Sequence, residues 1–128
     1  MRRAENGDPP TMVIEYPGFG QISVDGETYD HDIVIERGSA RKRDKGPSRH
    51  LKAHYGHTPL TAAEQLPLDV DRLVIGSGYS GRLPIVDEVE EAAVRHGTRL
   101  EVMPTAQACA MLNGLAREDV TAVLHVTC

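Results

Sequence analysis

The chain has 128 residues, a formal net charge of −5 and 40% hydrophobic residues, enough for one domain with an ordinary apolar core. It has one Phe, four Tyr and no Trp, which argues against a stacking platform for single-stranded nucleic acid. No apolar run approaches the ~20 residues that span a bilayer, and the first residues lack the apolar stretch of a secretory signal. We expect a single domain over residues 1–128, flexible over 1–10, cytoplasmic and without membrane contact.

The first predicted elements are β-strands. Residues 12–16 form a short apolar run. Asp25-Gly26 fits a two-residue hairpin turn, because a type I′ turn needs positive φ at both central positions. The turn would join strands over residues 22–24 and 29–35, in which apolar and polar residues alternate. His31, on the apolar face of the second strand, is expected to be a half-buried core residue.

Residues 37–57 carry the strongest charge asymmetry, a net +6 within an acidic chain. Gly, Pro and Ser interrupt this segment, so we expect a basic loop. A basic loop attracts an acidic protein or the phosphates of RNA or DNA; alternatively, it neutralises the chain's own acidic residues, including Glu88, Glu90 and Glu91. The candidate contact residues are Arg41, Lys42, Arg43, Lys45, Arg49 and Lys52.

Beyond this loop, helices and strands alternate. Thr61 and Glu64 match a capping box at the start of a short helix. Residues 73–75 are a continuous apolar run, as expected for a strand covered on both faces. Residues 100–103 are predicted to form another strand, and residues 120–126 a last apolar strand. Between them we predict one helix that begins at Pro84 and ends at Gly97, and a second that Thr105 caps. This β-α-β-α-β order predicts an α/β fold with a mainly parallel sheet and helices packed on it, next to a small N-terminal hairpin element. The direction of the last strand stays open.

Residues 76–81 read Gly-Ser-Gly-Tyr-Ser-Gly after a predicted strand, but Pro84 delays the next helix, so no dinucleotide cofactor is predicted. If strands 73–75 and 100–103 are parallel neighbours, this glycine loop and the Pro104-Thr105 turn lie at one sheet edge, where α/β proteins bind ligands. Helix N-termini there would favour a small anion or a phosphate. The candidate ligand residues are Gly76, Ser77, Gly78, Ser80, Arg82 and Thr105.

Metal and nucleophile patterns are weak. His50, His54 and His57 have a helical spacing, but there is no HExxH motif or nearby Cys, so no metal site is predicted. Residues three apart in a strand point to opposite faces, so His125 and Cys128 should not form a catalytic pair. Two cysteines are too few for a disulfide framework. We predict no catalytic residue.

One family resemblance rests on several segments taken together. They are Phe19-Gly20, Leu73-Val74-Ile75-Gly76-Ser77-Gly78, Val102-Met103-Pro104-Thr105, Asn113 and His125-Val126-Thr127-Cys128. In order and spacing they resemble the Mth-type domain family, which includes the adipogenesis-associated Mth-domain protein and, more distantly, an assembly factor of mitochondrial respiratory complex I. The resemblance covers nearly the whole chain from Phe19. It implies a three-layer α/β fold, with a mixed central sheet, helices packed on it and a small extra β element. It also implies a binding or assembly role, and it implies no reaction or cofactor.

We therefore expect a small non-enzymatic interaction or assembly module with a protein partner. The alternative is a protein or enzyme that binds a small anion or phosphate ligand through the glycine loop and the Thr105 turn. Contact of the basic loop with nucleic acid is the third hypothesis.

Overall fold

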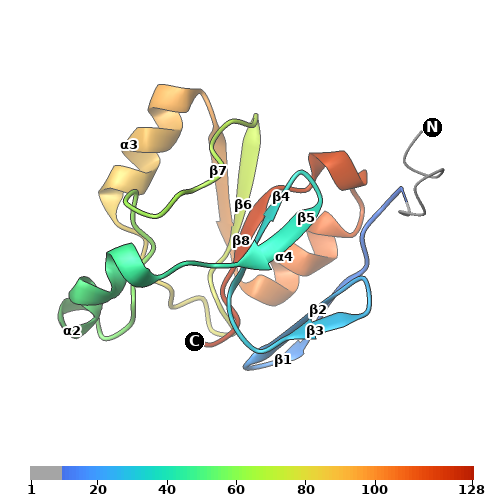
Figure 1. Ribbon diagram of the computed structural model, residues 1–128, viewed down its shortest axis with the longest axis horizontal. Helices are drawn as coiled ribbons and strands as arrows, with labels where there is room; N and C mark the ends of the chain where they lie inside the picture. Colours follow the sequence, from blue (N-terminus) through green and yellow to red (C-terminus); the bar gives the residue numbers. More distant parts are fainter. Residues whose placement is uncertain (1–9) are drawn as a thin grey trace.

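The computed structural model describes residues 10–128, so the expectation of flexibility over residues 1–10 falls, except for Pro10, outside the described residues. Two sheets and several helices form the fold (Figure 1). The small sheet has the order β1-β2-β3, and the central sheet has the order β5-β4-β8-β6-β7. The strands are β1 (Ile14–Gly18), β2 (Gln21–Val24), β3 (Glu27–Tyr29), β4 (Ile33–Glu36), β5 (Ser39–Lys42), β6 (Arg72–Gly76), β7 (Arg99–Met103) and β8 (Ala122–Leu124). The helices are η1 (Gly46–Leu51), α2 (Lys52–Tyr55), α3 (Asp87–His96), α4 (Thr105–Leu112) and η2 (Arg117–Asp119).

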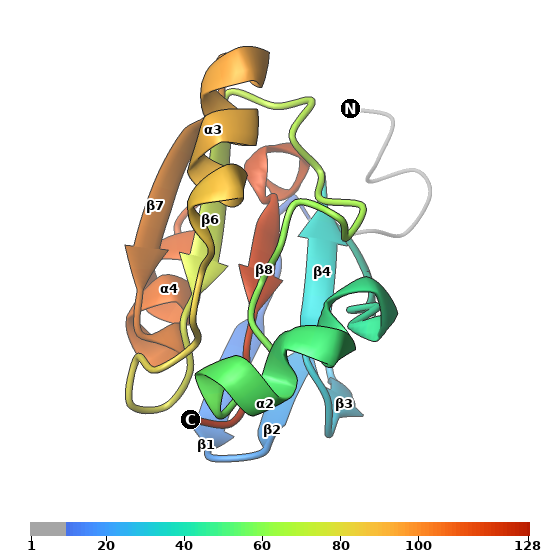
Figure 2. The same cartoon turned by 90° about the vertical axis from the view of Figure 1, so that its left-hand side faces the viewer.

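The molecule has three layers, as the family resemblance implies. Figure 2 shows α3 in front of the central sheet and α4 behind it, with the small sheet beyond. One apolar cluster fills the space between the central sheet, α4 and the small sheet, with Ile14, Ile35 and Leu112 among its fully buried members. A second cluster, which includes Leu60 and Val89, lies under α3. Burial on both faces explains why the inner strands β4, β8 and β6 are mostly apolar.

The predicted hairpin turn is confirmed, with φ of 51° at Asp25 and 87° at Gly26. The predicted strand over residues 29–35 is wrong in one respect. It divides into β3, which pairs with β2, and β4, which pairs with β5 and β8 in the central sheet. The chain passes between the two sheets around Asp32, whose buried carboxylate serves the site described below.

The prediction of a loop over residues 37–57 is also wrong, because the segment contains β5, η1 and α2. Arg37 and Gly38, both at positive φ, form the turn that folds β5 back on β4. Pro47 lies in the first turn of η1, where its missing N–H costs no hydrogen bond. Gly56, at φ 78°, ends α2.

Two helix starts differ from the prediction. No helix forms at Thr61, because Arg43 holds the Glu64 carboxylate at 2.8 Å and keeps it from completing a capping box. Helix α3 begins at Asp87 rather than at Pro84. The Pro84 carbonyl instead accepts a hydrogen bond from the Leu60 N–H at 2.8 Å. This bond joins the chain around Leu60 to the residues just before α3.

The last strand runs parallel to β6 and antiparallel to β4, so the central sheet is mixed. Strands β6 and β7 are parallel and in register, with Gly76 opposite Met103. Both strands therefore end at one edge of the sheet, called the carboxyl edge below. The glycine loop and the Pro104-Thr105 turn lie together at this edge, as predicted.

Candidate functional site

The hydroxyl of Thr105 joins three segments at the carboxyl edge. It accepts a hydrogen bond from the Gly78 N–H at 2.8 Å and donates one to the His125 carbonyl at 2.6 Å. Thr105 is therefore the first residue of α4 but not its cap, and Pro104 occupies the cap position. The Ser77 hydroxyl donates to the Met103 carbonyl at 3.1 Å. These buried bonds fix the glycine loop against the end of β7.

The amides of the glycine loop point at segment 125–128. The Tyr79 N–H donates to the Thr127 carbonyl at 2.7 Å, and the N–H groups of Ser80 and Arg82 both donate to the backbone oxygen of Cys128, at 3.2 and 2.9 Å. The donors that the sequence suggested for an anion thus bind oxygens of the chain itself.

Gly78 allows this close approach. Its φ is 109°, and a Cβ there would lie 2.3 Å from the Cys128 carbonyl carbon and 2.8 Å from the His125 ring. Gly76 is similarly crowded, since a Cβ would lie 2.9 Å from the Thr105 hydroxyl oxygen. Both glycines therefore have a packing role at the edge where the sequence predicted a ligand.

Residues of the small sheet also form hydrogen bonds that hold segment 125–128 in place. The Tyr16 hydroxyl and the Gly20 N–H donate to the Val126 carbonyl at 2.6 and 2.7 Å. The Asp32 carboxylate accepts from the Val126 N–H at 3.0 Å. Burial, together with the nearby acidic groups of Cys109, Tyr79 and Asp32, raises the pKa of Tyr16 to about 12. Tyr16 thus remains a neutral hydrogen-bond donor at physiological pH.

Asp32 organises a buried polar cluster that the sequence analysis did not predict. Its carboxylate lies 2.9 Å from Arg43 Nη1, 2.8 Å from His125 Nδ1 and 3.7 Å from Lys45 Nζ. Burial opposes ionisation of the carboxyl, but the hydrogen bond and charge of His125 and the charge of Lys45 outweigh it and hold the pKa of Asp32 well below its usual range. Asp32 is therefore a carboxylate in the folded protein.

The guanidinium of Arg43 links this carboxylate to a second one. It forms a two-pronged pair with Glu64 at 2.8 Å and also donates to the Pro59 carbonyl at 2.9 Å. Burial disfavours its charge, yet the bonds to Glu64 and Asp32 raise the pKa of Arg43 above the usual value. Ser48 donates to Glu64 at 2.6 Å. In the described part of the chain, every buried side-chain nitrogen or oxygen has a hydrogen-bond partner.

His125 lies at the centre of these contacts. Its other ring nitrogen, Nε2, is 3.3 Å from the Thr127 hydroxyl. The Asp32 carboxylate thus orients the imidazole, and the imidazole faces a hydroxyl. The side chain of His125 is only 5% exposed, so this arrangement fixes segment 125–128 and offers little access to a substrate.

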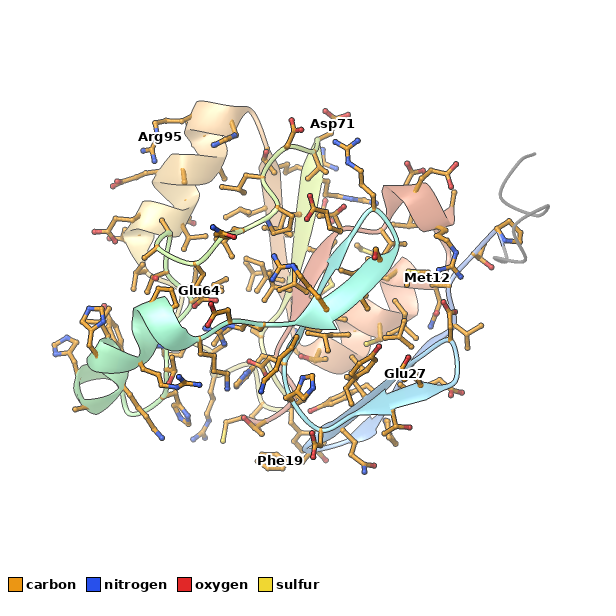
Figure 3. The ribbon with its side chains drawn as sticks, in the orientation of Figure 1. Met12, Phe19, Glu27, Glu64, Asp71 and Arg95 are labelled. Atoms are coloured by element: carbon orange, nitrogen blue, oxygen red, sulfur yellow. The ribbon has the colours of Figure 1, made fainter. Side chains whose placement is uncertain are left out.

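An exposed aromatic pair borders the same edge. Phe19, on the turn between β1 and β2, is 60% exposed and Tyr79, on the glycine loop, is 61% exposed. Their rings meet edge to face with centroids 6.4 Å apart, and Tyr16 packs against Tyr79 at 6.5 Å. Figure 3 shows Phe19 projecting from the lower rim of the molecule. The sequence gives no periodic signal for this pair, because both rings stand on turns.

Of the candidate basic residues, Arg43 and Lys45 lie beside Asp32, whereas the other four are exposed. Arg43 is 2% exposed and belongs to the buried cluster, while Arg41, on β5, donates to the Gln65 carbonyl at 3.0 Å. Lys45 is partly exposed beside Asp32. Lys42, Arg49 and Lys52 are exposed.

A large surface cavity, about 680 Å³, lies at the other end of the sheet. Arg37, Asp71, Arg72 and Arg99 line it together with further acids. Figure 3 shows Asp71 and Phe19 at opposite ends of the molecule, so this cavity is remote from the carboxyl edge. Its lining mixes positive and negative side chains and contains none of the predicted ligand residues.

No group of three or more His, Cys, Asp or Glu side chains among residues 10–128 is arranged to hold a metal ion. No helix in that range combines the length and apolar character that a bilayer crossing requires.

Fold and site together define a mixed α/β domain in which a glycine loop and a buried Asp-His-Arg cluster hold segment 125–128 at the carboxyl edge. The chain belongs to the family described as "Protein of unknown function (DUF498/DUF598)", whose model matches residues 14–125. No curated protein matches it.

Solved structures support the same fold. A conserved hypothetical protein, PH1505 from Pyrococcus horikoshii OT3, is 30% identical, with a TM-score of 0.73 over 90% of this chain and 98% of that one. A structure named MT938 is 25% identical, with a TM-score of 0.67 over 92% of this chain and 100% of that one. An outer membrane protein from Bartonella henselae, 18% identical, matches with a TM-score of 0.61 over 93% of this chain and 98% of that one, and shows likeness of fold alone. The predicted fold class is thereby confirmed, as is membership of a family whose function is not known.

Proposed function

We propose that this protein is a non-enzymatic binding module that recognises a protein partner at the carboxyl edge. The observation that carries the proposal is the exposed Phe19–Tyr79 pair. Large aromatic rings dominate the energetics of protein interfaces, because each buries a large area at little cost in side-chain entropy. Two such rings in contact on the surface of a chain with only five Phe and Tyr residues form a natural anchor.

The surroundings of the pair support binding rather than chemistry. Tyr79 stands on a loop whose amides are hydrogen-bonded to segment 125–128, and Phe19 stands on a turn bonded to Val126. The two rings are thus mounted on a pre-organised base, which lowers the entropy lost on association. The buried ionic cluster beneath them is closed and internally paired. The resemblance to the Mth-type domain family, with its assembly factor, points in the same direction.

Binding of a small anion at the glycine loop is the second candidate. It is favoured by the convergence of the Ser80 and Arg82 N–H groups on one backbone oxygen of Cys128, since convergent amides are what an anion site requires. A phosphate or carboxylate would have to displace that oxygen. Titration with inorganic phosphate, followed through the amide NMR signals of residues 79–82, tests this candidate, and unchanged signals at 20 mM phosphate would dispose of it.

Affinity capture with matched variants tests the protein-binding proposal. A double variant, Phe19→Ser with Tyr79→Ser, removes both rings from exposed positions, whereas Val94→Ser removes an exposed apolar side chain from α3. We expect proteins captured by the wild type and by Val94→Ser to be lost from the double variant by at least about tenfold, the effect of a loss of 1.4 kcal/mol. Equal capture by all three folded proteins would refute the proposal.

A further inference from the structure

A second surface of the molecule carries acidic side chains on α3 and basic side chains on the neighbouring residues 46–57. Helix α3 presents Asp87, Glu90 and Glu91 on its outer side, all exposed, around Val94, which is 79% exposed. The exposed Arg95 lies beside them, so the three carboxylates outnumber one positive charge on this face. The inner side of the same helix is apolar and buried. The outer side of α3 is called the acidic face below.

The neighbouring element is basic. Residues 46–57, which contain η1 and α2, carry Arg49 and Lys52 and three histidines and have no acidic residue. Arg49 and Lys52 are exposed, and Tyr55 is 40% exposed beside them. This element is called the basic element below.

Both surfaces look out from the same side of the molecule. In Figure 1, α3 and α2 lie above one another on the left, and Figure 2 shows both on the side that faces the viewer. The backbone explains this proximity, because Leu60, just beyond α2, exchanges hydrogen bonds of 2.8 and 3.1 Å with Pro84 and Val86, just ahead of α3.

The two surfaces do not neutralise each other within one copy. Among residues 10–128, no ion pair joins α3 to the basic element. The alternative that the basic segment serves to neutralise Glu88, Glu90 and Glu91 through direct contacts therefore lacks support from the described ion pairs. An acidic face and a basic element thus lie side by side, with no ion pair between them in the described part of the chain.

We propose that this side of the molecule is a self-association surface, on which a second copy of the chain docks about a twofold axis. In such a pair, the acidic face of each copy lies against the basic element of the other, so that one contact is made twice. A second copy satisfies both charges at once. A nucleic acid would suit the basic element but would be repelled by the acidic face beside it.

The dimer that this surface supports is weak and sensitive to salt. Exposed ion pairs contribute little each, and they are screened beyond about 8 Å at 0.15 M salt. Val94 on one side and Tyr55 on the other provide the apolar contact area. We expect dissociation constants of about 10–100 μM at 50 mM NaCl, rising at least about tenfold at 500 mM NaCl.

Charge reversal in both surfaces provides the test. Variant A carries Glu90→Lys and Glu91→Lys, and variant B carries Arg49→Glu and Lys52→Glu. Each variant makes its own two surfaces alike in charge, so each should be monomeric alone in sedimentation velocity at 50 mM NaCl. In a mixture, the acidic face of variant A, now positive, can pair with the basic element of variant B, now negative. The unchanged acidic face of variant B can pair with the unchanged basic element of variant A, so both contacts are attractive. An equimolar mixture should therefore regain the wild-type dimer.

The matched control is Glu27→Lys with Asp30→Lys, which changes the net charge as much as variant A does but lies on exposed positions near the small sheet. It should dimerise as the wild type does. A wild type that stays monomeric at 300 μM and 50 mM NaCl, variants that still dimerise, or a mixture that stays monomeric would each overturn the proposal. Tight binding of a fluorescein-labelled 20-nucleotide DNA by the wild type but not by variant B, without dimerisation, would assign the basic element to nucleic acid instead. The variants leave Phe19 and Tyr79 unchanged, so partner capture at the carboxyl edge is assessed independently.

Discussion

Replacing Asp32 with Asn tests the role of the buried ionic cluster. The substitution keeps the shape of the side chain but removes the charge that faces Arg43 at 2.9 Å and His125 at 2.8 Å. Arg43 then keeps only Glu64 as an ionic partner. Removing one partner of a buried pair costs about 3–5 kcal/mol. For a chain of this size, that loss lowers the Tm by about 10–20 °C.

The lowered pKa of Asp32 also predicts how the stability difference between wild type and Asp32→Asn changes with pH. Because the folded-state pKa of Asp32 is lowered, its ionised form stabilises the fold above the unfolded pKa of about 4, and this stabilisation is lost as the pH falls through that value toward the folded one. The difference in free energy of unfolding between wild type and Asp32→Asn should therefore be full at pH 7 and shrink from about pH 5 downward.

Urea denaturation at several pH values, supported by calorimetry, measures this difference. Asp30→Asn is the matched control, since Asp30 is exposed two residues away and its replacement should change stability by less than about 0.5 kcal/mol. If Asp32→Asn is as stable at pH 7 as the control, or if its deficit is the same at pH 3 and pH 7, the reasoning about the cluster is wrong.

Three further predictions concern the carboxyl edge and the core. Gly78→Ala should lose at least about 2 kcal/mol, more than Gly97→Ala, because both glycines have positive φ but only Gly78 has atoms within 4 Å of the added Cβ; equal losses in urea denaturation would contradict the close approach to Cys128. Thr105→Val should cost about 1–3 kcal/mol, while Thr105→Ser should keep both hydrogen bonds and most of the stability; a stable valine variant would show that these bonds are dispensable. Cys109, whose pKa burial raises to about 12, should resist iodoacetamide in the native protein at pH 8, and mass spectrometry showing its alkylation before unfolding would contradict its burial.

Much of the fold is visible in the sequence, because it rests on local patterns. The Asp25-Gly26 turn, the apolar run of β6 and the Gly97 helix end each have a chemical signature within a few residues. The parallel order of β6 and β7 then brings the glycine loop and the Pro104-Thr105 turn to one edge. The missing helix at Thr61 has a long-range cause: Glu64 matches a capping residue in sequence, but Arg43, 21 residues away, binds its carboxylate.

The site was harder to predict because its contacts are long-range. Asp32 and His125 lie 93 residues apart and meet only through the sheet topology. Arg43 could be named as basic, but sequence gives no indication that it is buried between two carboxylates. Phe19 and Tyr79 stand on turns, so neither shows a periodic pattern. The one available signal was that Asp32 precedes an apolar strand, where a buried acid requires a partner.

The most direct test of the proposed function is site-specific photo-crosslinking at the carboxyl edge. A photoreactive phenylalanine analogue would replace Phe19 or Tyr79 in turn, with position 71, at the opposite end of the molecule (Figure 3), as the control. We predict that one protein partner crosslinks at both 19 and 79 and not at 71. Crosslinks of equal yield at all three positions, or at 71 alone, would contradict the assignment of the partner surface to the aromatic pair.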